Sequence, residues 1–414
     1  MVSYLPFANN SALQFYSSNF TGIISATNPS LPNPVQGQTF ANCPFVSALA
    51  SIAWVNRKFI RNNISGPDGN GDYTFTFWDY GVNNTITLPN TTPGTPTPVT
   101  VGPSALLDSS NQCCNASGFY GQGSAYINEI WPALYERAYA KFCMYENGLA
   151  LQATPTAPMS ETNLTNTACD PALGDVVALS HNSVGNYWGG NGAYALMYLT
   201  GLPCVNLSTQ TSNFPTTMYG GVAGNVGSTA NSALQSSQAG IDSANGSPDT
   251  VMCSLYEYIK AGLCNEYGIL YGVNKTRYPC VATTYASASL SPIYNSNPNA
   301  VNYGNTTIIP NHNYPVLGVF DAPNGLHYFI LRTTFGSNVN FPNPTFGSIA
   351  TGTWTYYDAQ FPLGTTTQYP ATSSKKTMIT INSNLSSATP NAVFGLEQGA
   401  FVNYFSSIGW AQGY

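Results

Sequence analysis

The residues of this chain best suited to chemistry are a cysteine and a histidine, of which Cys43 has the more informative surroundings. It stands in Asn-Cys-Pro-Phe-Val-Ser-Ala-Leu-Ala, at the start of an apolar pattern with helical spacing, and is one of nine cysteines. An odd cysteine is an intermolecular link or a free reactive thiol. Pro44 suits a first helical turn, where the helix dipole and N–H groups favour a thiolate. We expect Cys43 to be unpaired and the other eight cysteines to form disulfides; the alternative is a buried cysteine that caps a core helix.

Several helices and strands must position these side chains, and their order predicts an α+β fold with two lobes. Apolar spacing predicts helices over 44–61, 127–147, 189–201 and 248–261. Alternation predicts a hairpin over 72–89 and strands at Pro-Val-Leu-Gly-Val-Phe and His-Tyr-Phe-Ile-Leu-Arg after residue 308. The Pro-, Thr- and Ser-rich segment 90–125 and the nearly chargeless segment 202–247 are expected to be loops.

The composition narrows the setting, because only 7% of the residues are charged whereas about a quarter is usual. Hydroxyl and amide groups must therefore solvate the surface, which suits an extracellular or virion-surface protein. The Asn-X-Ser/Thr sequons allow glycosylation, and the many cysteines suit an oxidising compartment. The start of the sequence does not resemble a signal peptide.

The same composition argues against several partners. The 11 basic residues are scattered, so we expect no nucleic-acid partner. No apolar run is long enough to predict a membrane span. The three histidines are isolated and there is no Cys-x-x-Cys pair, so we assign no metal and no cofactor.

Seven segments, in order, resemble the calpain family of cysteine peptidases. Asn-Cys-Pro-Phe-Val-Ser-Ala-Leu-Ala resembles its nucleophile helix, and Glu-Ile-Trp-Pro-Ala-Leu-Tyr-Glu-Arg-Ala-Tyr-Ala-Lys-Phe is close to its Trp-x-x-Leu-x-Glu-x-Ala-Tyr-Ala-Lys helix. Gly-Asp-Tyr-Thr-Phe-Thr-Phe-Trp resembles its first hairpin, and Gly-Gly-Asn-Gly-Ala-Tyr-Ala-Leu-Met-Tyr-Leu-Thr-Gly its Leu-Thr-Gly segment. Asn-His-Asn-Tyr-Pro-Val resembles the strand with the catalytic histidine, followed by likenesses at Arg-Thr-Thr-Phe-Gly and Phe-Val-Asn-Tyr-Phe.

This resemblance implies a papain-like two-lobed fold, with a helical lobe over 1–201 and a β-rich lobe over 202–414. It makes Cys43 the nucleophile and His312 the base of a peptidase acting on protein or peptide substrates. Thr333 takes the place of the Asn that orients the histidine. Gln36 and Gln38 flank the place of the oxyanion-hole Gln, which here is Gly37. The calcium dependence of the family does not carry over, because acidic residues are scarce.

Two hypotheses stay open at this point. One is an extracellular calpain-like cysteine endopeptidase that works through a Cys43 thioester. The other is a structural or assembly protein of a virion or extracellular filament, which self-assembles or binds other surface proteins and has lost or reduced catalysis. The substitution at Thr333 and the displaced Gln favour the second hypothesis, while the order of the matching segments favours the fold in both.

Overall fold

The structure is a computed structural model of the 414-residue chain. Parts of the sequence analysis fall outside the residues that it describes, among them Gln36, Gln38 and the returning strand of the predicted hairpin. The described residues are 3–6, 43–80, 93–102, 104–107, 131–146, 192–209, 256, 259–260, 275–286, 308–322, 327–334, 352–357, 376–381, 393–397, 401 and 404–411.

The central element is helix α1, Cys43–Val55, and every one of its residues is buried. Its apolar and small side chains let neighbours pack on all sides, and each large apolar side chain buried here contributes about 1.5–3 kcal/mol. The sequence predicted one helix through residue 61, which is wrong. Asn56 is extended, at φ −149° and ψ 97°, and its side chain accepts a hydrogen bond from the main-chain N–H of Phe59. It thereby caps a second helix, α2, Arg57–Asn62.

On one side of α1 lie helix α3, Trp131–Glu146, and a three-stranded antiparallel sheet in the order β2-β3-β4. The strands are β2 Ile64–Ser65, β3 Tyr73–Asp79 and β4 Thr95–Val101. Aromatic packing joins these parts: Phe45 of α1 stacks on Tyr139 of α3 with ring centroids 4.6 Å apart, and Phe77 of β3 stacks on Phe142 at 5.0 Å. The sequence analysis predicted helices at the positions of both α1 and α3.

Strand β4 corrects the sequence analysis, which made 90–125 a loop. Its run Thr-Pro-Thr-Pro-Val-Thr-Val pairs with β3 over its whole length, with Pro96 opposite Trp78 and Pro98 opposite Thr76. Proline cannot donate to a strand ladder, so it is confined to edge strands, and β4 is the edge of this sheet. A further strand from the same segment, β5 Ser104–Leu107, pairs with β1, Ser3–Pro6.

On the other side of α1 lies a six-stranded sheet in which every neighbouring pair is antiparallel, in the order β12-β9-β8-β7-β13-β6. Strand β9 has the predicted bounds, and β8 contains the predicted Pro-Val-Leu-Gly-Val-Phe run. The strands are β6 Cys204–Ser208, β7 Cys280–Thr284, β8 Asn313–Asp321, β9 His327–Arg332, β12 Val393–Glu397 and β13 Phe405–Ala411. A separate pair consists of β10 Gly352–Tyr357 and β11 Lys376–Ile381.

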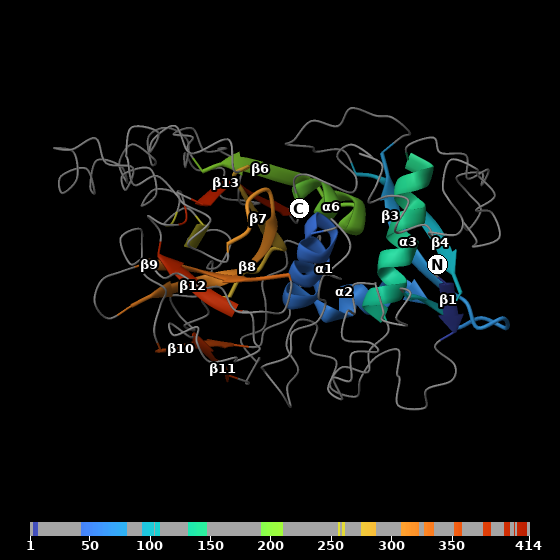
Figure 1. The fold of residues 1–414 in the computed structure, drawn as a ribbon, viewed down its shortest axis with the longest axis horizontal. Coiled ribbons are helices and arrows are strands. Elements are labelled where there is room, and N and C mark those ends of the chain that lie inside the picture. Colours follow the sequence, from blue (N-terminus) through green and yellow to red (C-terminus); the bar gives the residue numbers. More distant parts are fainter. Residues whose placement is uncertain are drawn as a thin grey trace.

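Figure 1 shows α1 between the six-stranded sheet and the group formed by α3, β3 and β4. Helix α6, Gly192–Thr200, packs beside α1 and precedes β6. Helices together with antiparallel sheets form the α+β architecture predicted from the sequence. The predicted boundary of the two lobes falls at Gly201, which has φ +68° and links α6 to β6; the division into lobes at this residue stays a prediction.

Three side chains on one face of α1 fasten the helix to the six-stranded sheet. Ser47 Oγ donates to the carbonyl of Asn313 at 2.8 Å, Ser51 Oγ to that of Cys280 at 3.0 Å, and Trp54 Nε1 to that of Leu317 at 2.9 Å. Their spacing of four and three residues is that of a single helix face. The first residue of α1 is thereby held next to the start of β8.

Candidate functional site

Cys43 is the first residue of α1 and Pro44 the second, so the thiol stands at the N-terminus of the buried helix. Its side chain is almost completely enclosed, at 7% exposure. Burial raises the pKa of the Cys43 thiol, whereas hydrogen bonds from Asn313 and from the main chain at Cys43 itself oppose this effect. The start of a helix also favours negative charge. The thiol therefore has several groups in place that can stabilise a thiolate, in a site from which water is largely excluded.

The segment that leads into β8 brings His312 and Asn313 to the start of α1. Asn313 Nδ2 lies 3.6 Å from Cys43 Sγ, and the main chain of Asn313 also donates a hydrogen bond to the thiol. The turn before it contains Asn311 at φ 51°, a left-handed conformation that Asn tolerates better than most residues. The immediate neighbour of His312 is thus in contact with the sulfur that the sequence analysis identified.

The His312 ring is buried and held on several sides. The main-chain N–H of His312 donates to Thr284 Oγ1 at 2.8 Å, and the His312 ring packs edge-on against Tyr314 with centroids 5.2 Å apart. The ring Nε2 lies 2.8 Å from Thr334 Oγ1. Burial lowers the pKa of His312 to about 4, because the charged imidazolium loses its hydration. A neutral imidazole is therefore the favoured form at neutral pH.

The hydroxyl that contacts the His312 ring belongs to Thr334, one residue beyond Thr333, which the resemblance selected. The sequence analysis aligned Arg332 and Gly336 with the family pattern, which left Thr333 in the place of the Asn. Both threonines are buried, and both follow the end of β9 at Arg332. Sequence spacing alone does not tell which of two adjacent hydroxyls faces a histidine from another strand. A role for Thr333 stays a prediction.

Asn313 is the residue of this site that sequence reasoning missed. Its Oδ1 accepts hydrogen bonds from the main-chain N–H of Gly192 at 2.9 Å and from Thr283 Oγ1 at 2.8 Å. Gly192 is required here, because a Cβ atom on it would lie only 2.4 Å from a methyl group of Val281. The only sequence signal was the position of Asn313 next to His312, and its partners lie 30 to 270 residues away.

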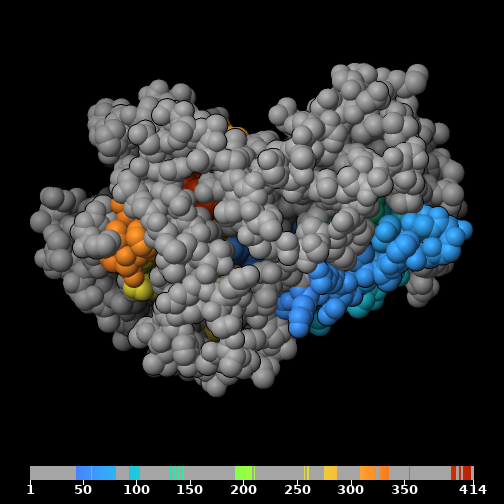
Figure 2. Space-filling model, turned by 90° about the horizontal axis from the view of Figure 1, so that it is seen from below, coloured from blue at the N-terminus to red at the C-terminus, as the bar shows by residue number. Residues whose placement is uncertain are grey.

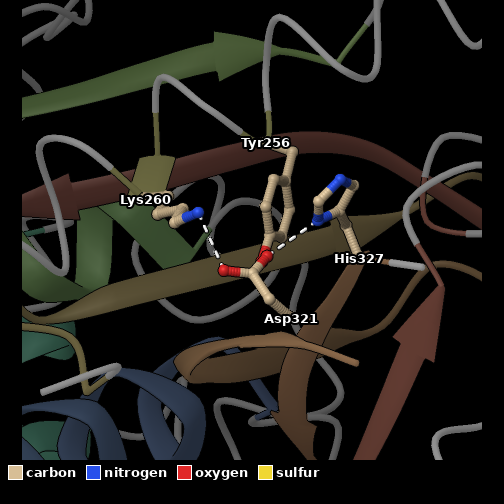
Figure 3. Close-up of polar contacts among 4 residues, drawn as sticks. All are labelled: Tyr256, Lys260, Asp321 and His327. Atoms are coloured by element: carbon tan, nitrogen blue, oxygen red, sulfur yellow. Dashed lines mark hydrogen bonds and ion pairs between the residues drawn. The ribbon is translucent and has the colours of Figure 1, made fainter. Parts of the chain in front are cut away.

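A second polar cluster lies at the far end of β8 from Asn313 (Figure 3). Asp321 Oδ1 accepts hydrogen bonds from Tyr256 Oη and His327 Nδ1, both at 2.7 Å, and Asp321 Oδ2 lies 2.8 Å from Lys260 Nζ. The hydrogen bond from His327, followed by those from Lys260 and Tyr256, holds the pKa of Asp321 well below its usual range. The side chains of Lys260, Asp321 and His327 are partly exposed, and Tyr256 is buried. His327 lies opposite Asp321 and thus closes the hairpin of β8 and β9.

The two ends of β8 are far apart. The strand has nine residues, so at about 3.3 Å per residue the Asp321 cluster lies about 26 Å from Asn313. Figure 2 shows the orange β8–β9 region at the surface on one side, opposite the blue segment that follows α1. The Asp321 cluster is therefore separate from the thiol site.

The cysteine pairing predicted from the odd count is wrong for the residues that the structure describes. Cys43, Cys143, Cys204 and Cys280 are all buried thiols without a disulfide bond. Three of them pack inside helices or strands of the core, where a small apolar side chain suits the site. The odd count therefore does not single out Cys43; its place at the start of α1 does.

Metal binding and membrane insertion were also considered for the described part of the chain. Within those ranges no group of three His, Cys, Asp or Glu side chains could hold a metal ion. None of the helices described there is long and apolar enough to cross a membrane.

Comparison with known proteins finds a family that resembles part of this chain. Residues 28–172 match the calpain family cysteine protease. This match supports a calpain-family catalytic core in that part of the chain. No curated protein matches the chain. The calpain-family match includes Cys43, β3 and α3, and it ends before His312, which precedes β8, and Thr334, which follows β9.

The calpain-family core implies a papain-like fold and supports a cysteine peptidase-like function with protein substrates. The structure adds what the matched segment lacks, because the contact between Asn313 and Cys43 Sγ brings the His312 segment to the matched helix. Gln36 and Gln38 lie within the matched segment but outside the described residues.

Proposed function

We propose that this chain is a calpain-like cysteine endopeptidase that hydrolyses peptide bonds through a thioester on Cys43. The observation that carries the proposal is the contact of the Asn313 amide and main chain with Cys43 Sγ, which seats the His312 segment beside the thiol. A thiol becomes a good nucleophile when a nearby base removes its proton. The calpain-family match supports the same assignment of Cys43.

His312 is the base of the proposed reaction. Its Nε2 is next to Thr334 Oγ1, so the proton of Cys43 passes to the other ring nitrogen, Nδ1, when Thr334 accepts the Nε2–H bond. Burial favours the neutral forms of both groups, so proton transfer accompanies the attack of the sulfur on the substrate carbonyl. The imidazolium then protonates the leaving amine as the C–N bond breaks. In the second half, His312 takes a proton from water, whose oxygen attacks the thioester carbonyl. The C–S bond then breaks, the imidazolium returns the proton to the Cys43 sulfur, and the carboxylic acid product leaves.

The negative charge on the substrate oxygen needs hydrogen-bond donors. We assign one to the main-chain N–H of Cys43, because it lies at the N-terminus of α1 where N–H groups have no partner within the helix. The proposed second donor is the side-chain amide of Gln36 or Gln38. Loss of one such donor typically costs a factor of about 100–1000 in rate.

Two histidines give a matched test of this proposal. His312→Gln and Cys43→Ser should each abolish hydrolysis of an unfolded protein substrate, because base and nucleophile are lost. His327→Gln should hydrolyse the same substrate at the wild-type rate, since His327 lies at the distant end of the β8–β9 hairpin. Equal hydrolysis by wild type and His312→Gln would contradict the assignment.

The alternative is a calpain-fold structural or assembly protein of a virion or extracellular filament with impaired catalysis. One observation favours it: burial raises the pKa of Cys43 and lowers the pKa of His312. Both shifts disfavour the thiolate–imidazolium ion pair. The low charge content supports a location outside the cell for either function. The same assay separates the two, because a folded wild type that hydrolyses nothing and assembles into particles in sedimentation experiments would be the structural protein.

A further inference from the structure

We propose that the Asn313 carboxamide is a catalytic residue of this site, whose N–H group donates to Cys43 Sγ and stabilises the thiolate during attack. The proposal rests on the proposed function for its catalytic meaning, but it concerns the state of the thiol and can be measured without a substrate. It adds to His312 a second side chain that touches the reacting atom. The resemblance assigned no role to this position.

The orientation of the amide follows from its hydrogen bonds. The oxygen and nitrogen of an Asn side chain are told apart by their partners. Here the main-chain N–H of Gly192 can only donate, and Thr283 Oγ1 lies at 2.8 Å on the same amide atom. The atom that faces these two groups is therefore the oxygen. The NH2 group is left to face Cys43 Sγ, at 3.6 Å.

The amide is held rigidly, because the two partners of its oxygen belong to different elements and the main chain of Asn313 is fixed as well. Gly192 begins α6 and Thr283 lies in β7. Ser47 of α1 donates to the main-chain carbonyl of Asn313 at 2.8 Å. The side chain is only 1% exposed, so water does not compete for its hydrogen bonds. A donor fixed in advance stabilises a developing charge without reorganising at the moment of reaction.

A neutral donor suits the electrostatics of this particular site. Charge on Cys43 is penalised by burial, and the buried His312 ring is a weak source of positive charge. The thiolate that forms in the reaction must then be stabilised by neutral groups nearby. The hydrogen bonds from Asn313 are the groups that lower the pKa of the thiol most.

The decisive experiment replaces the donor and keeps the acceptor. Asn313→Asp retains an oxygen for Gly192 and Thr283 but presents an acceptor to Cys43 Sγ, and Asn313→Ala removes the whole amide. The rate of Cys43 alkylation by iodoacetamide is followed against pH on the folded full chain, with the labelled peptide identified by mass spectrometry. Because a hydrogen bond to a charged group contributes about 1.5–3 kcal/mol, the midpoint should rise by about 1–2 pH units in both variants.

Ser51→Ala is the matched control, since it breaks the two hydrogen bonds between Ser51 Oγ and the main chain of Cys280 in β7, two turns from the thiol. Its alkylation midpoint should equal that of wild type. Thermal unfolding shows which variants are folded, and if Asn313→Asp does not fold, Asn313→Ala decides. A folded Asn313 variant with an unshifted midpoint would overturn the proposal and leave Asn313 a purely structural residue.

The outcome is independent of the outcome for the proposed function. A chain that hydrolyses no substrate, but whose midpoint rises in Asn313→Ala, has the thiolate donor and is not a peptidase. A chain that hydrolyses substrate with an unshifted midpoint is a peptidase in which Asn313 does not act on the sulfur.

Discussion

At the scale of single residues, two buried side chains contact the thiol and the imidazole of the proposed site. Asn313 faces Cys43 Sγ, and Thr334 faces His312 Nε2. Neither residue was predicted for its part, because each contact joins segments that are far apart in the sequence. The place of Cys43 was accessible to sequence reasoning, since an apolar run that starts with Pro44 predicts a helix from residue 44, with Cys43 at its N-terminus.

The adjacent threonines allow the orienting group to be identified. Thr334→Val removes the hydroxyl that contacts His312 Nε2 and keeps the shape of the side chain, so the ring loses one hydrogen bond. A misplaced catalytic group costs up to about 100-fold, and we expect kcat/KM for an unfolded protein substrate to fall at least about tenfold. Thr333→Val is the matched control and should show the smaller loss. A larger loss in Thr333→Val would restore the assignment made from the sequence.

At the scale of elements, β8 connects the thiol site at its start with the Asp321 cluster at its end. Its start carries Asn313 against the thiol, and its end carries Asp321 opposite His327 in the hairpin with β9. The bounds of β9 were predictable, because His-Tyr-Phe-Ile-Leu-Arg is a short run rich in aromatic and aliphatic residues. The pairing of β3 with β4 was not, because a Pro-rich run reads as a loop unless its place at a sheet edge is known. The break between α1 and α2 depends on the single side-chain cap at Asn56.

The Asp321 cluster should make the β8–β9 hairpin sensitive to acid. The pKa of Asp321 is held below its unfolded value, so the stabilisation is present above pH 4 and is lost as the carboxylate becomes protonated at lower pH. Asp321→Asn keeps the shape but removes the charge that His327 and Lys260 face. We expect a loss of about 1 kcal/mol or less at pH 7, because the groups are partly exposed.

The measurement is urea unfolding of wild type and Asp321→Asn at pH 7 and at pH 3. The difference between the two proteins should shrink at the lower pH and also in high salt, which screens the ion pair with Lys260. A difference that stays constant between these pH values would show that the charge of Asp321 does not contribute to the hairpin.

At the scale of the whole molecule, the thiol site lies where the helices meet the six-stranded sheet. The side chains of Ser51 and Trp54 hold α1 to β7 and β8, and buried Lys275 lies over the Trp54 ring at 4.4 Å from its centroid. The α+β architecture and the apolar faces of α1 and α3 could be predicted from periodicity. The junction could not, because it consists of side chain to main chain hydrogen bonds between residues more than 200 positions apart.

This junction predicts how the stability of the whole chain depends on pH. His312 has a pKa of about 4 in the folded protein and an ordinary value of 6.5, so the unfolded chain takes up its proton first as the pH falls. Its contribution to stability is complete above pH 6.5 and is lost progressively down to pH 4, a difference of about 3 kcal/mol.

His312→Gln has no such titration, so urea unfolding at pH 7, 5.5 and 4 should show a shallower decline of the free energy of unfolding than in wild type. His327→Gln should decline over this range as wild type does, because the buried ring of His312 is retained. Parallel declines of wild type and His312→Gln would mean that water or a charged neighbour stabilises the imidazolium. The resting site would then hold a thiolate–imidazolium ion pair, and not the neutral thiol and imidazole from which the proposed reaction starts.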